Sequence, residues 1–308
     1  MSETSQRALS AVKSGFPKAG KTIFWLLKLI LPISLGVQLL MYTGLLDYFA
    51  SYLNPVFQAI GLPGSSAIAF VSSLFLPLYA PIAIITTLGL TIRETTILAI
   101  MCLISHNTLV ESAVQKKTGS SFAFIWFLRI GMSFLAAFIW NLVLPEEMGQ
   151  VLTISGTGVA EQSFIEMLKT WALGAGSLTL KVVIIVTALM ILQRLLEEFK
   201  IMDALAKIFA PMMTVMGLSK NSSFLWFVAN IIGLTYGSAI LIEQVEAGKI
   251  SRNEARMLNN HLAISHSLLE DTLIFVAIGV PILWITFPRV LLAVIVVWSI
   301  RLLKFDRL

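Results

Sequence analysis

Long runs of apolar residues are the feature that most limits what this chain can fold into. Three of these runs are Thr22–Leu46, Phe122–Leu144 and Ile282–Ile300. Each is close to the roughly 20 residues that an α-helix needs to cross the hydrocarbon core of a bilayer. Hydrophobic residues make up 57% of the chain and charged residues 13%, whereas a soluble domain keeps about a quarter of its residues charged. The sequence therefore predicts an all-α integral membrane protein in contact with a lipid bilayer.

The distribution of basic residues argues against a nucleic-acid partner. The formal net charge is +5, but Lys and Arg lie in short segments beside the apolar runs, as the positive-inside rule describes. Lys13, Lys18 and Lys21 precede the first run. Because this run is longer than the core of a signal peptide, we expect an uncleaved first span in the inner (plasma) membrane.

The chain carries the same pattern twice. Seven positions in the first half recur in the second without a gap, namely Glu94/Glu254, Leu98/Leu258, Ile104/Ile264, Ser105/Ser265, His106/His266, Leu109/Leu269 and Glu111/Asp271. Arg129 and Arg289 correspond at the same offset, and Gly61-Leu62 corresponds to Gly217-Leu218 at a slightly shorter one. So many matches in register predict an internal duplication.

The duplication predicts the order of the domains. We expect a cytoplasmic N-terminal segment, a first repeat, an extracytoplasmic linker and a second repeat, with bounds 1–21, 22–145, 146–172 and 173–308. Each repeat contains an apolar helix, an amphipathic stretch, an interrupted apolar segment and two closing helices. The expected bounds of all but the interrupted segments are 22–46, 47–62, 92–115 and 121–144 in the first repeat, and 173–195, 200–218, 252–276 and 281–303 in the second.

The interrupted segments decide the predicted topology. Pro77 and Pro81 break the first segment, and Gly233 and Gly237 break the second. If each segment is a re-entrant hairpin, almost all Lys and Arg residues lie on the cytoplasmic side, whereas crossing helices would move many of them outside. We therefore expect two inverted repeats, each with three transmembrane helices, a hairpin and an amphipathic interfacial helix, and both termini in the cytoplasm. Inverted repeats with broken segments near the midplane are common in transporters.

Polar residues at the expected mid-membrane depth are the candidate substrate-binding residues. Polar groups placed against lipid cost several kcal/mol, so they are expected to face protein or water. His106 and His266 lie near the centres of their spans, and Glu270 shares a helix face with His266. The histidines either bind a solute or hold the two repeats together by hydrogen bonds. The candidate set is His106, His266, Asn260, Glu270, Asn230, Ser105, Ser265, Tyr79 and Tyr236.

Two buried ion pairs are predicted with a structural role. Arg129 and Arg289 each lie about eight residues into an apolar helix, roughly 12 Å deep. Glu111 and Asp271 lie in the preceding helices at a depth that an arginine side chain can reach. We therefore expect the pairs Glu111–Arg129 and Asp271–Arg289.

No pattern in the sequence indicates an enzyme or a cofactor. The chain lacks the His-Glu-x-x-His, Walker and nucleophile-elbow motifs. Cys102 and His106 share a helix face, but two ligands do not define a metal site, so metal binding stays open at this point.

The repeated unit resembles the nucleoside-recognition or Gate domain. The resemblance covers about residues 22–303 and is carried by Gly61-Leu62 and Gly217-Leu218 before the broken segments, and by the Ile-Ser-His motifs that end at His106 and His266. This domain occurs in bacterial ferrous-iron permeases, in spore maturation membrane proteins and, in distant form, in concentrative nucleoside transporters. The resemblance implies a fold of opposed hairpins and interfacial helices.

These observations predict a transporter rather than an enzyme. We expect a permease for a small polar solute, nucleoside-like by resemblance, that works by alternating access between the repeats. The alternatives are a divalent-metal permease and a non-transporting membrane component that acts with a partner protein. A homo-oligomer or a partner membrane protein is compatible with either.

Overall fold

The computed structural model describes residues 3–149, 163–231 and 233–303. It is 81% helix, and its described residues form no β-strand. The prediction of an all-α membrane protein is confirmed. Four helical segments are long and apolar enough to cross a bilayer, namely Ile92–Lys116, Phe122–Val143, Phe164–Glu198 and Ile282–Leu302. The full set of six crossings stays a prediction.

The helices follow one another in the same order in each half of the chain. The first half contains α1 (Glu3–Tyr42), α2 (Leu45–Gln58), α3 (Ser66–Phe75), α4 (Tyr79–Ile85), α5 (Ile92–Ser105), α6 (Thr108–Lys116) and α7 (Phe122–Val143). The second contains α8 (Phe164–Glu198), α9 (Ile201–Val215), α10 (Ser223–Ile231), α11 (Leu234–Glu246), α12 (Arg252–Ser265), α13 (Glu270–Ala277) and α14 (Ile282–Leu302).

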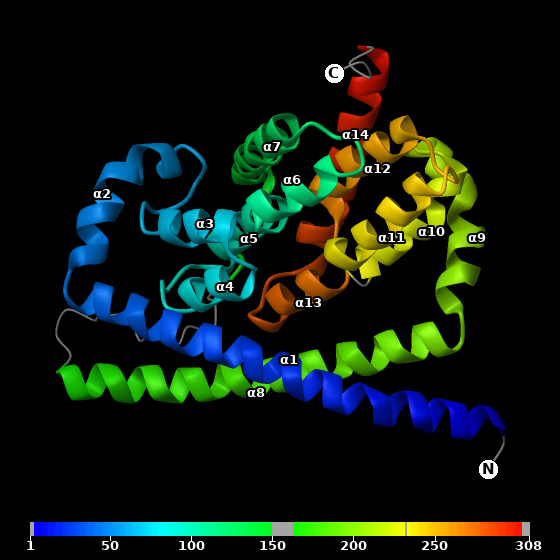
Figure 1. Cartoon of the computed structure of the whole chain (residues 1–308). Coiled ribbons are helices and arrows are strands. Elements are labelled where there is room, and N and C mark those ends of the chain that lie inside the picture. The colour runs from blue at the N-terminus through cyan, green and yellow to red at the C-terminus, as the bar shows by residue number, and fades with distance from the viewer. Residues whose placement is uncertain (1–2, 150–162, 232, 304–308) are drawn as a thin grey trace.

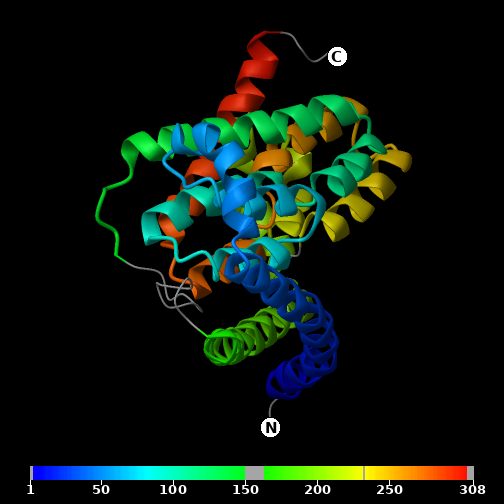
Figure 2. The same cartoon turned by 90° about the vertical axis from the view of Figure 1, so that its left-hand side faces the viewer.

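Two long helices form a pair along one side of the molecule. Helices α1 and α8 pack against each other and run in opposite directions, with the remaining helices stacked on one side of the pair (Figures 1 and 2). Helices α2 and α9, which follow them in the chain, stand at opposite ends of this arrangement (Figure 1). Gly15 allows the close approach, because a Cβ atom there would lie 3.1 Å from the Ile191 side chain.

Both long helices begin earlier than the apolar runs suggested. Helix α1 includes most of the segment 1–21, and α8 begins at Phe164 rather than near residue 173. Ser163 and Glu166 form a capping box that starts α8, because each side chain satisfies a backbone N–H of the first turn. The first turns of α1 are held by Arg7, whose Nε lies 2.8 Å from Glu198 Oε1 at the end of α8.

The centre of the molecule is built from the closing helices of the two halves. Helix α5 packs against α7 and α14, and α12 packs against α14 and α7. The run Thr95–Ser105 of α5 is buried on every side, as expected for a helix that is apolar all round. Every residue from Met257 to Ser265 in α12 is also buried, although several are polar. The polar side chains of α12 therefore have to find partners inside the protein.

The expected interruptions are present, and two further ones appear. Helix α3 ends before Pro77, α10 ends before Gly233, and each packs against the helix that follows it. The sequence also predicted continuous helices over 92–115 and 252–276. The segment Ile92–Lys116 is apolar and long enough to cross a bilayer, but each predicted helix is broken near its middle. Helix α5 stops at Ser105 and α12 stops at Ser265, each followed directly by a histidine in extended backbone.

Candidate functional site

Two short turns lie between the broken halves of these central helices. We call residues 105–108 the His106 turn and residues 265–269 the His266 turn. Each histidine is extended, with ψ 150° at His106 and 163° at His266. The next residue in each turn has a left-handed backbone, with φ 48° at Asn107 and 51° at Ser267. Such angles are uncommon for residues other than glycine and persist where surrounding contacts hold them.

The interrupted segments hold the two turns in place. The Asn107 N–H donates a 2.7 Å hydrogen bond to the Ser73 carbonyl in α3. In the second half, the N–H groups of Ser267 and Leu269 donate to the carbonyls of Ala229 and Asn230 in α10, both at 3.1 Å. The backbone groups freed by each break are thereby bonded to the broken segment of the same half.

The two histidines face each other at the centre of the molecule. His106 Nε2 lies 3.3 Å from His266 Nε2, and the ring centroids are 4.8 Å apart. On the other side of each ring, Nδ1 faces a backbone carbonyl, that of Cys102 at 3.2 Å and that of Leu262 at 2.8 Å. A carbonyl can only accept, so both Nδ1 atoms carry a proton, and in a neutral ring the Nε2 atom then carries the lone pair.

Two carboxylates complete this cluster. Glu111 Oε1 lies 3.5 Å from His106 Nε2, and Glu111 Oε2 lies 3.3 Å from His266 Nε2. Asp271 Oδ2 lies 3.4 Å from His106 Nε2. All four side chains are at most 14% exposed. One ligand atom from each of His106, His266 and Asp271 lies within 4.8 Å of the others, so these three side chains could hold a metal ion.

The arginines bind the ends of the broken helices. Arg129 forms the expected ion pair with Glu111 at 2.5 Å and also donates to the carbonyls of Ile104 and His106, both at 2.7 Å. Both arginines are completely buried. Since a helix that stops leaves its last carbonyls unpaired, a buried guanidinium at that position satisfies them.

The second expected ion pair is not formed. Arg289 donates instead to the Thr272 hydroxyl at 2.6 Å and to the carbonyls of His266 and Ile285. The threonine next to Asp271 provides a nearer acceptor, so the carboxylate is left to face His106. The two halves therefore treat their equivalent carboxylates differently.

The other predicted site residues divide into two groups. Tyr79 reaches the second half, where its hydroxyl donates to Glu270 Oε1 at 3.3 Å. Ser105 and Ser265 are bonded within their own helices, and Asn230 donates to the Trp226 carbonyl. The buried Oδ1 atoms of two predicted residues have no hydrogen-bond partner among the described residues, namely Asn230 and Asn260. The side chain of Tyr236 lies outside the described part of the chain.

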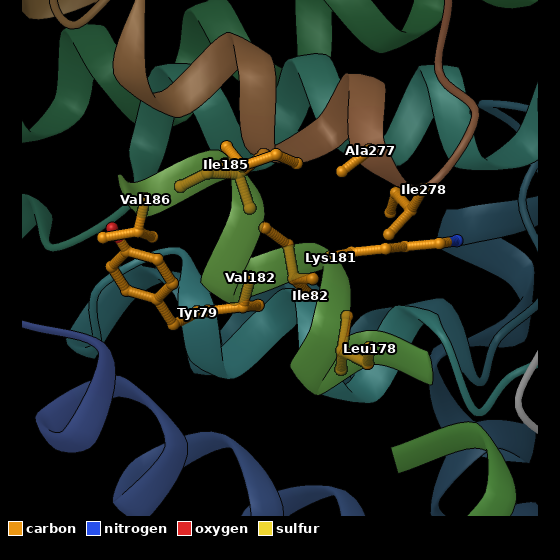
Figure 3. A pocket seen from close by; sticks show the side chains of 10 residues that line it. Tyr79, Ile82, Leu178, Lys181, Val182, Ile185, Val186, Ala277 and Ile278 are labelled. Carbon is orange, nitrogen blue, oxygen red and sulfur yellow. The ribbon is translucent and has the colours of Figure 1, made fainter. Parts of the chain in front are cut away.

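Two polar residues outside the predicted set of site residues also have notable places in the structure. Asn259 joins the halves, because its side chain donates to the Thr118 hydroxyl at 2.6 Å and to the Ser120 hydroxyl at 2.9 Å. Lys181 lies in the middle of the apolar helix α8 and, together with Tyr79, lines a small and largely apolar pocket between α4, α8 and α13 (Figure 3). In the sequence, Lys181 could have been noticed as a lone lysine within a long apolar run.

Comparison with known proteins gives two matches. The sequence model of the Gate family, described as nucleoside recognition, matches residues 23–116 and 179–297. The Uncharacterized membrane protein YvoD of Bacillus subtilis (strain 168) is 32% identical over 294 residues, which cover 95% of this chain and 93% of that protein.

Proposed function

Because this chain belongs to the Gate, or nucleoside-recognition, family of membrane proteins, we propose that it carries a small polar solute across the inner membrane. The solute class that the family description favours is nucleoside-like. The imidazole, amide and carboxylate groups of the candidate residues are of the kinds that hydrogen-bond bases and ribose hydroxyls. The protein is not an enzyme in this proposal.

The observation that supports transport is the meeting of the two His turns in the buried core. Non-helical backbone at membrane depth is tolerated where it is buried in protein or lines a cavity, and transporters place their binding sites at such breaks. His106 and His266 stand on broken helices and are bonded through their turns to further broken segments. Polar groups that are costly in a membrane are thus gathered at one point between the two halves.

The proposed cycle uses the duplicated halves. We place the two repeats, 22–145 and 173–308, in opposite orientations in the bilayer, with re-entrant hairpins at α3–α4 and α10–α11 and both termini in the cytoplasm. Each half then supplies one side of a central site that opens alternately to either face of the membrane. Tyr79 of the first half and Glu270 of the second are in direct contact. Opening of the central site has to break this contact.

Uptake by proteoliposomes tests this proposal. Purified protein is reconstituted, and the entry of labelled nucleosides and nucleobases is measured for the wild type, His266→Ala and the matched control His261→Ala. His261 is equally buried, but its ring bonds Ser265 and Trp226 and lies outside the His106–His266 pair. Saturable uptake that His266→Ala abolishes and His261→Ala retains is expected. The proposal is overturned if wild-type liposomes take up these solutes no faster than empty ones.

A second candidate function is supported by the chemistry of the centre. Two imidazoles and two carboxylates are ligands for a divalent metal ion, so the same uptake assay includes divalent metals as cargo. A metal flux without a solute flux would identify a metal permease. No flux of either kind would favour a membrane component that works through a partner protein.

A further inference from the structure

We propose that His106, His266, Asp271 and Glu111 bind one divalent transition-metal ion between the two His turns. This inference goes beyond transport, because binding at equilibrium needs no flux. The ion would be held jointly by the two halves, with one histidine and one carboxylate from each.

The first argument is the orientation of the imidazoles. The carbonyls of Cys102 and Leu262 fix the proton on Nδ1 of each ring, so two Nε2 lone pairs face each other at 3.3 Å. Two acceptors at that distance repel unless a positive charge lies between them. In the other tautomer of either ring, with the proton on Nε2, an unprotonated Nδ1 would face a carbonyl. The repulsion between two acceptors would then lie at Nδ1 instead of at Nε2.

The second argument is that a proton on the nearest carboxylate does not satisfy the cluster. A proton on Asp271 would bridge its 3.4 Å contact with His106, but it would leave the contact between the two Nε2 atoms unchanged. Glu111 Oε2 already accepts from the guanidinium of Arg129, and the two Glu111 oxygens lie 3.5 Å and 3.3 Å from the two Nε2 atoms. A single cation at the centre satisfies all of these contacts together.

The third argument is the spacing of the ligand atoms. In a tetrahedral zinc site with bonds of about 2.0–2.1 Å, neighbouring ligand atoms lie roughly 3.3–3.4 Å apart. Four contacts of this cluster measure 3.3, 3.3, 3.4 and 3.5 Å. The contacts of His106 Nε2 with His266 Nε2 and with Asp271 Oδ2 match this spacing, and Glu111 adds an oxygen at a similar distance from each imidazole.

The fourth argument is the support behind the ligands. Metal-binding histidines usually donate their other N–H group to a carbonyl or carboxylate, which fixes the ring. Both histidines do so here. Glu111 is held by Arg129, whereas Asp271 Oδ2 is buried and has no hydrogen-bond donor among the described residues. The Asp271 oxygen is thus a free ligand pointed at the imidazoles.

Equilibrium dialysis of the full-length protein tests the site. Detergent-purified chain without a polyhistidine tag is dialysed against Zn²⁺ or Co²⁺, and bound metal is quantified by mass spectrometry. We expect one ion per chain and, with Co²⁺, the intense visible absorption of a four-coordinate ion. His266→Asn and Asp271→Asn should each weaken binding at least about tenfold.

His261→Asn is the matched control, because it removes the remaining histidine of the chain and leaves the cluster intact. It should keep the full stoichiometry and the Co²⁺ spectrum. Circular dichroism establishes that each variant is folded before its binding is compared. The inference is overturned if the wild type binds no metal in stoichiometric amount, or if folded His266→Asn binds as tightly as the wild type. Neither the stoichiometry nor the affinity depends on transport. Failure of the metal site can therefore be distinguished from failure of the transport proposal.

Discussion

At the scale of single residues, the two arginines show how equivalent positions of the repeat have diverged. Arg129 and Arg289 each donate to the carbonyl of the histidine in their own half. Beyond that shared contact, Arg129 binds a carboxylate and Arg289 binds the Thr272 hydroxyl. The carboxylate of the first half is thereby paired with an arginine, while that of the second half lies beside His106 instead.

Arg129→Met is expected to destabilise the protein strongly. It leaves the Glu111 carboxylate and two helix-end carbonyls buried without their donor, and breaking a buried pair by removing one partner costs about 3–5 kcal/mol. Thermal unfolding in detergent, followed by circular dichroism, measures the loss. The double variant with Glu111→Gln should recover part of it, because no unpaired charge is left. A melting temperature within a degree or two of the wild type would contradict this account.

The site could be predicted only in part at this scale. Helix depth and reach were enough to pair Glu111 with Arg129. The same reasoning failed for Asp271 and Arg289. The guanidinium of Arg289 donates to the hydroxyl of Thr272, the residue after Asp271. That His106 and His266 touch depends on how two separate helices are placed, which no local spacing encodes.

At the scale of elements, the breaks had different origins. Pro77 and Gly233 are helix breakers, and the interruptions beside them were visible in the sequence. The turns at His106 and His266 contain neither proline nor glycine. Tertiary contacts impose these turns, such as the hydrogen bond from the Asn107 N–H to Ser73, and a local pattern does not reveal them.

The contact between α10 and α11 depends on a missing side chain. A Cβ atom at Gly237 would lie 2.9 Å from both Cα and Cβ of Ala229, and backbone at that distance cannot yield without moving a helix. Gly237→Ala is therefore expected to lower stability by about 1–3 kcal/mol. Gly131→Ala is the matched control, since a Cβ atom there meets nothing within 4 Å, and it should be neutral or gain up to about 1 kcal/mol. Comparable melting temperatures for the two variants would count against the close packing.

At the scale of the whole molecule, the apolar runs predicted the fold class and the repeat predicted the order of helices. The lengths of α1 and α8 were not predictable in this way. Their extensions pack helix against helix, as the ion pair between Arg7 and Glu198 illustrates. A search for spans by hydropathy stops where the apolar run stops, although the helix continues.

The proposed orientation of the halves can be tested with single cysteines. Cys102 is the only cysteine of the chain and is completely buried, so the background should stay unlabelled. Lys117→Cys and Lys169→Cys replace two exposed residues. An impermeant maleimide added to intact cells should label position 169 and spare position 117 until the membrane is opened. Labelling of position 117 from outside would mean that the interrupted segment α3–α4 crosses the membrane.

The contact between the two histidines has a geometric consequence. Equivalent atoms of duplicated halves that touch each other lie where a two-fold axis would cross the molecule, and the Nε2 atoms of His106 and His266 are such a pair. A ligand held there is presented with the same imidazole by both halves. If the two halves exchange conformations, the contact between the two histidines stays in the same position. The opening toward one face of the membrane is then replaced by an opening toward the other. The ligand would then stay still, and the protein would move around it.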